Sequence, residues 1–274
     1  MRPAPVRSAP KKDWRSVIRS PVFDIFQFTV LVGLVVWFFA ESSETLGYNW
    51  QWYQVPRYLF TLDDGGFRAG PLLEGLMVTF HISAISLVLA FVIGLITALF
   101  RLSNAFVAQT LARFYLETSR NTPLLIQLFF IYFVVGPVLG LERFPSAVLA
   151  LSLFEGAYAS EIFRAGIISI QRGQWEAAYS LGLNTVQAYR TIILPQAIRR
   201  ILPPLTSQAI SLIKDSALVS TIAIYDLTMQ AQAIISETFL TFELWFTVAA
   251  MYLAVTITLS VIVNIMEHRL KVIT

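Results

Sequence analysis

The sequence predicts an all-α integral membrane protein with six transmembrane helices and both termini in the cytoplasm. Hydrophobic residues make up 56% of the 274 residues and charged residues only 14%, a composition typical of membrane proteins. Apolar runs recur along the chain, most of them close to the roughly 20 residues that cross a bilayer as a helix. The segments between these runs alternate in net charge, as the positive-inside rule expects.

The first predicted span, residues 22–40, follows a tail of residues 1–21 that carries six basic residues and one acidic residue. We expect this tail to be disordered. The residues before Glu41 are Phe38, Phe39 and Ala40, which make a poor signal-peptidase site, so an uncleaved span is favoured over a signal peptide. The other predicted spans are residues 72–100, 124–141, 145–170, 201–224 and 244–266.

The charges of the connecting segments give the predicted orientation. Basic residues outnumber acidic ones in four segments, which are residues 1–21, 101–122, 164–200 and 267–274. The segments that alternate with them, residues 41–70, 142–143 and 226–243, are neutral or acidic. Lys and Arg accumulate in cytoplasmic loops, so the stretch 173–195 is expected in the cytoplasm. Because the basic residues lie between apolar runs and form no single patch, nucleic-acid binding is not predicted.

The stretch 173–195, GQWEAAYSLGLNTVQAYRTIILP, is too polar to cross a membrane. Gly182 is suited to end a short helix in a left-handed conformation. Asn184 is suited to cap the next helix, with Gln187 three residues later in the capping-box position. Two helices this short are marginal unless something packs on them. The stretch is therefore predicted to contact another subunit, and the alternative is a merely structural pair of helices.

This stretch resembles the EAA signature of permease subunits of ABC importers. Three further strings resemble the polar amino acid branch of that family: ETSRNTPLLIQ from Glu117, GAYASEIFR from Gly156 and LIKDSAL from Leu212. The resemblance covers about residues 72–266 and implies a five-helix type I permease core. Residues 72–274 are then expected to form the permease domain, and residues 22–71 look like an added span and extracytoplasmic loop.

The resemblance also implies which residues couple the chain to an ATPase. These are the residues of the signature itself, Glu176, Ala177, Ala178, Gly182, Leu194 and Pro195. Glu176 is expected to face the ATPase or to pair with a nearby base, and the two alanines keep one helix face thin for close approach. The alternative for Glu176 is a solvated helix charge.

Polar residues inside the predicted spans are candidates for the substrate path, because intramembrane polar groups usually face a cavity or one another. Gln208, Ser211 and Asp215 share one helix face at spacings of three and seven, and Gln127 and Glu155 are further candidates. The alternative is a buried network that only holds spans together. Relatives that carry basic amino acids tend to hold an acidic residue where Gln208 aligns, so the resemblance favours neutral polar or acidic substrates.

Charged residues in two predicted spans are expected to form structural ion pairs. Arg164 follows Glu161 by three residues and is placed to pair with it on one helix face. Lys214 is expected to pair with Asp215 or with a neighbouring carboxylate.

The sequence also limits the chemistry of this chain. It has no P-loop, no cysteine and two widely separated histidines, so we expect no enzyme and no metal site here. ATP and Mg are expected on a partner ATPase. The resemblance implies an ATPase dimer, a second identical or related permease, an extracytoplasmic binding protein and an amino acid substrate, in a bacterial cytoplasmic (inner) membrane. The alternative, an ion-coupled secondary transporter or channel for small polar solutes, leaves the stretch 173–195 unexplained.

Overall fold

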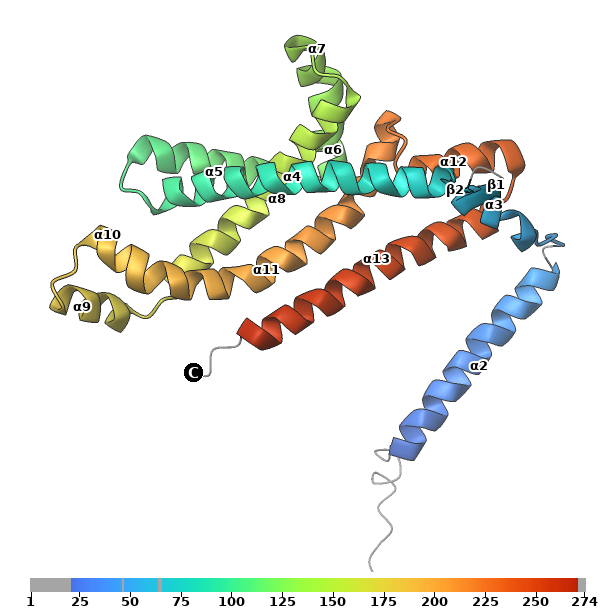
Figure 1. Cartoon of the computed structure of the whole chain (residues 1–274), viewed down its shortest axis with the longest axis horizontal. Helices are drawn as coiled ribbons and strands as arrows, with labels where there is room; N and C mark the ends of the chain where they lie inside the picture. Colours follow the sequence, from blue (N-terminus) through green and yellow to red (C-terminus); the bar gives the residue numbers. More distant parts are fainter. Residues whose placement is uncertain (1–20, 46, 64–65, 271–274) are drawn as a thin grey trace, which may run out of the picture. The chain divides into compact units, whose positions relative to one another are not determined.

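The structure is a computed structural model that describes residues 21–45, 47–63 and 66–270 (Figure 1). The chain divides into two compact units, residues 1–50 and residues 51–274, and each is described by itself. Most of the predicted disordered tail, residues 1–20, lies outside the described residues.

The first unit contains α2 (Pro21–Thr45), the helix predicted from the first apolar run. Its apolar side chains are exposed on all sides within the unit, as expected of a helix surrounded by lipid. Within the described residues, its apolar stretch Phe23–Phe38 is shorter than a full span. The helix itself is thus confirmed, and its crossing of the membrane stays a prediction.

The second unit begins with a small folded segment before the first long helix. It consists of η1 (Trp52–Gln54), α3 (Pro56–Leu59) and the antiparallel strands β1 (Phe60–Asp63) and β2 (Gly66–Ala69). The backbone N–H of Gln51 donates a hydrogen bond of 2.6 Å to Glu243 at the start of the last helix. This bond ties the segment to the end of the unit.

Three helices of the described part are long and apolar enough to cross a membrane. They are α4 (Pro71–Leu102), α8 (Arg143–Ile168) and α13 (Thr241–Leu270). The number rises to five if each of two bent helix pairs, residues 106–139 and 185–238, counts as one span. A multi-pass helical membrane protein is confirmed, and the count of six spans stays a prediction.

The segment between α4 and α8 differs from the expected loop and straight span. Residues 101–122, predicted as a loop, hold helix α5 (Phe106–Asn121). The expected span 124–141 turns by 111° from α5 and is divided into α6 (Leu124–Phe130), a π-helical turn η2 (Ile131–Val135) and α7 (Gly136–Leu139). Pro137 has no N–H to continue regular α-helical bonding, and the π-turn lies immediately before it.

The second half of the unit also departs from the predicted boundaries. After α9 (Arg172–Ser180), α10 (Thr185–Ala188) and the π-turn η3 (Tyr189–Ile193), helix α11 runs from Leu194 to Asp215. It continues as the 3-10 helix η4 (Ser216–Ile222), before α12 (Leu227–Thr238). Pro203 and Pro204 lie near the start of the predicted span 201–224, but they are inside α11. The helix begins earlier, at Leu194, with Pro195 in its first turn.

Close packing of α4 against α8 forms the centre of this unit. A Cβ atom on Gly94 would lie 2.8 Å from the Ala159 Cβ and 2.9 Å from the Gly156 carbonyl oxygen. Nearby, the Ser152 hydroxyl of α8 donates to the Ser86 carbonyl of α4 at 3.3 Å. Small residues let membrane helices approach closely and gain van der Waals contact. The crossing therefore depends on side chains that are small or absent.

We predict that Gly94→Ile lowers the stability of the folded chain by about 1–3 kcal/mol, the usual cost of overpacking a tight contact. Gly33→Ile in α2 is the matched control, because a Cβ there would meet nothing within 4 Å. Thermal unfolding in detergent checks this. Equal unfolding midpoints for the two variants would contradict the proposed packing.

Candidate functional site

The polar hairpin, residues 173–195, has the two helix ends that the sequence predicts. Gly182 has a φ of +78°. Its N–H donates to the Tyr179 carbonyl at 2.9 Å, and the Leu183 N–H donates to the Ala178 carbonyl at 3.2 Å, which is the Schellman pattern. Asn184 and Gln187 then form the reciprocal capping box at 2.9 and 3.0 Å. The turn between α9 and α10 is therefore held by hydrogen bonds among its own neighbouring residues.

The signature residues of the polar hairpin divide into buried and exposed groups. Ala178 is fully buried within the chain, whereas Ala177 and Pro195 are exposed. Glu176 is exposed and forms an ion pair with Arg172, one turn earlier on α9, at 3.0 Å. Its carboxylate is therefore already paired with a basic residue of its own helix. Leu194, 40% exposed, is the first residue of α11.

The outer tip of the polar hairpin is apolar, which the sequence analysis missed. Leu181 is 77% exposed and Val186 is 74% exposed, on either side of the Gly182 turn. Two exposed aliphatic side chains beside one turn of an otherwise polar hairpin are candidates for contact with a partner. The available signal was their position beside the two helix caps.

An aromatic contact joins the polar hairpin to the helix that follows it. The Trp175 ring meets the Tyr189 ring edge-on, with centroids 4.8 Å apart. Tyr189 begins η3, and the buried residues Ile193 and Ala197 continue this packing into α11. The hairpin and the start of α11 thus form one packed body.

The other end of α11 reaches a buried polar site. The Gln208 amide donates a hydrogen bond to Oε2 of Glu155 on α8, and Glu155 is only 1% exposed. Among the described residues, Oε1 of Glu155 has no hydrogen-bond partner. The half-buried Asp215 interacts with the Glu155 carboxylate. The structure thus brings together three of the five predicted path residues.

A cavity of about 200 Å³ opens beside this polar site. It lies between α4, α8 and α11, and Glu155 and Gln208 supply polar groups to a wall that is otherwise mostly apolar. The remaining lining residues are Leu87, Ala90, Phe91, Ala159, Leu202, Leu205, Thr206 and Ala209. A buried carboxylate with one unused oxygen beside a small cavity is suited to bind an ammonium group or another hydrogen-bond donor.

Three predicted residues lie apart from this cavity or lack the expected contact. Gln127 donates to the backbone carbonyls of Ser119 and Thr122 at 2.7 and 2.9 Å and so closes the turn after α5. Ser211 lies on α11 between Gln208 and Asp215 but does not line the cavity. Lys214 is exposed.

Within the described residues, Lys214 lies at ion-pair distance from no carboxylate, but its charge still acts on Asp215. Lys214 is about 100° around the helix from Asp215, so its side chain leaves α11 in another direction.

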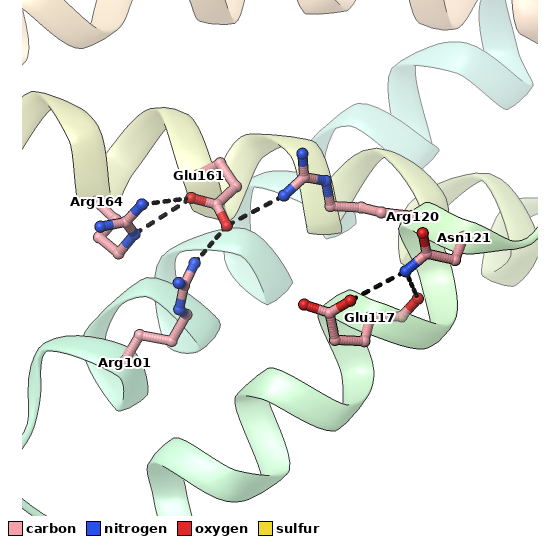
Figure 2. Close-up of polar contacts among 6 residues, drawn as sticks. All are labelled: Arg101, Glu117, Arg120, Asn121, Glu161 and Arg164. Atoms are coloured by element: carbon pink, nitrogen blue, oxygen red, sulfur yellow. Dashed lines mark hydrogen bonds and ion pairs between the residues drawn. The ribbon is translucent and has the colours of Figure 1, made fainter.

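The predicted pair of Glu161 and Arg164 is present and is part of a larger cluster (Figure 2). Arg164 donates to Oε2 of Glu161 at 2.9 and 3.2 Å. Arg101 of α4 and Arg120 of α5 both approach Oε1, Arg120 at 3.3 Å. One carboxylate therefore links three helices, and the two additional arginines could not be predicted from spacing within one helix.

Comparison with known proteins places these features in a family. A family model described as "Binding-protein-dependent transport system inner membrane component" matches residues 90–272. The glutamine transport system permease protein GlnP of Escherichia coli (strain K12) is 38% identical over 205 residues, which cover 74% of this chain and 94% of GlnP. The L-cystine transport system permease protein TcyB of Bacillus subtilis (strain 168) is 38% identical, covering 73% and 87%.

A solved structure agrees with these relatives. A crystal structure of an amino acid ABC transporter with histidines has a TM-score of 0.69 and 38% identity, covering 73% of this chain and 94% of that chain. The multi-pass helical fold of this chain and its similarity to these proteins identify a membrane component of a transport system. The chain belongs to the family of binding-protein-dependent transport system inner membrane components.

We predict that Gln208→Leu destabilises the folded chain by about 1–3 kcal/mol, because it leaves the buried Glu155 carboxylate without its donor. Thr206→Val is the control, since Thr206 also lines the cavity but its hydroxyl bonds only to backbone carbonyls of its own helix. Thermal unfolding in detergent measures both. An unchanged midpoint for Gln208→Leu would argue against the bond.

Proposed function

We propose that this chain is the permease subunit of an ATP-driven amino acid importer. The observation that carries the proposal is the folded polar hairpin joined through α11 to a mostly apolar cavity that holds the Glu155 and Gln208 side chains. The relatives named for glutamine and cystine transport and the solved amino acid transporter support the substrate class. The neutral amide of Gln208 beside the cavity favours a neutral polar amino acid such as glutamine.

The proposed path of coupling runs along one helix. A separate ATPase docks on the polar hairpin and moves it when ATP binds and is hydrolysed. Because η3 and α11 follow α10 without a break, this motion reaches Gln208 and Asp215. Pro203 and Pro204 lie between the two ends and remove two backbone donors, which gives α11 a place to bend. The cavity then alternates its access between the two sides.

The complete machine contains more than this chain. We propose a dimer of ATPase subunits that bind ATP and Mg, a second identical or related permease, and an extracytoplasmic binding protein. In this arrangement the chain has six spans and both termini in the cytoplasm of a bacterial cell, so that the polar hairpin meets the ATPase. Residues 72–274 form the permease domain, and residues 22–71 are an addition to it.

We propose the apolar tip, Leu181 and Val186, as the ATPase contact instead of Glu176, because both side chains are exposed and Glu176 pairs with Arg172. We predict that Leu181→Asp weakens binding of the cognate ATPase about 30-fold, which corresponds to loss of a contact worth about 2 kcal/mol. ATP-driven uptake should fall with it. Leu139→Asp in α7 is the control, because Leu139 is also an exposed leucine, 62% against 77%. Unchanged ATPase binding by Leu181→Asp would reject the tip as the contact.

The proposed orientation is testable because the chain has no cysteine. We predict that Glu142→Cys reacts with an impermeant maleimide added outside intact cells, whereas Val186→Cys reacts only after the membrane is opened. Both residues are exposed, and Glu142 lies between two predicted spans, so access depends on the side of the membrane. The reverse pattern would show that the orientation is inverted.

A further inference from the structure

We propose that the arginine cluster around Glu161 binds the phosphate of an anionic phospholipid headgroup. The cluster consists of Arg101, Arg120, Arg164 and Glu161, from three helices that meet near the end of α4 (Figure 2). We place this lipid in the cytoplasmic leaflet. That placement rests on the proposed orientation, but the binding of the headgroup does not.

The charges of the cluster do not balance. Three guanidinium groups share one carboxylate, which accepts at most about four hydrogen bonds from their fifteen N–H donors. Glu117, the nearest other acid drawn in Figure 2, accepts from the Asn121 amide at 3.0 Å. Counting Glu117 as well, one positive charge and most of the donors remain available. An anion with several oxygens would use them.

Arg120 is the arginine best placed to reach such an anion. Its side chain is 47% exposed, against 21% and 32% for Arg101 and Arg164. Its bond to Glu161 is long at 3.3 Å, and its guanidinium lies 5.8 Å from the centre of the Tyr158 ring. The ring supports one face of the guanidinium. Only Nη1 bonds to Glu161, so the edge formed by Nε and Nη2 is available for bidentate contact with a phosphate.

The surroundings of Arg120 favour a lipid over a free phosphate ion. Helix α5 packs inward with Ala112, Leu116 and Ser119, while Val107, Leu111 and Phe114 stay 60–73% exposed. Exposed apolar side chains along one side of a helix are typical of the membrane interface. They lie on the other side of α5 from Arg120, at about 100° per residue, so they place the helix beside lipid without lining the arginine cluster itself. Basic pockets between membrane helices on the cytoplasmic side bind anionic headgroups, and the three arginines come from three helices.

The test measures how lipid stabilises the full chain. The protein is purified in a neutral detergent, and its unfolding temperature is followed as phosphatidylglycerol, phosphatidylcholine or inorganic phosphate is added. We expect phosphatidylglycerol alone to raise it. Arg120→Gln should weaken the apparent affinity for phosphatidylglycerol about fivefold, the factor for one interfacial arginine. Glu161 keeps Arg101 and Arg164 in this variant, so the fold should persist.

Arg113→Gln is the matched control. It removes the same charge from an exposed position two turns earlier on α5, and Arg113 forms no ion pair within the described residues. We expect its lipid response to match that of the wild type.

Three results would overturn the proposal. Equal losses of lipid affinity in both variants would indicate general attraction, and equal protection by inorganic phosphate would indicate a free-ion site. A less stable lipid-free Arg120→Gln protein with an unchanged lipid response would assign Arg120 to helix packing. None of these results depends on transport, so the proposed function stands or falls separately.

Discussion

The close backbone contact of α4 with α8 is the constraint on which the rest of the second unit depends. Gly94 lies against Gly156 and Ala159, and α8 carries its two acidic residues close to this crossing. Glu155 immediately precedes Gly156 and faces α11, whereas Glu161 follows the crossing and meets arginines of α4 and α5. A change in how α4 crosses α8 would therefore move both the cavity and the arginine cluster.

Helix α11 connects the polar hairpin with the polar residues beside Glu155. Its first turn belongs to the same packed body as Trp175 and Tyr189 of the polar hairpin, and its later turns hold Gln208 and Asp215 beside Glu155. The proposed docking surface and the cavity are thus connected by one continuous helix. The prolines inside it, where regular helix bonding is interrupted, lie between these two places.

Features set by neighbouring residues could be predicted from the sequence. The left-handed Gly182 turn, the capping box of Asn184 and the Glu161–Arg164 pair each depend on a few adjacent positions. The long helices α4, α8 and α13 follow from apolar length. Helix α5 was missed because its polar residues made residues 101–122 look like a loop, although the amphipathic pattern that suits a helix was present.

Contacts between distant residues could not be predicted in the same way. Arg101 and Glu161 are 60 residues apart, and Glu155 and Gln208 are 53 apart, so only the packing of three helices brings each pair together. Gln127 differs, because its amide donates to the carbonyls of Ser119 and Thr122, which are only 8 and 5 residues away and are brought to it by the turn after α5. Hydropathy places such residues in a membrane helix, but it does not say which neighbour each one meets.

The most direct measurement is amino acid uptake into proteoliposomes that contain this chain, with and without its cognate ATPase and binding protein. The account predicts that glutamine or a similar neutral amino acid accumulates only when ATP, the ATPase and the binding protein are all present. Uptake driven by an ion gradient in the absence of the ATPase would contradict this expectation, and would identify the cavity beside Glu155 as part of a secondary transporter or channel.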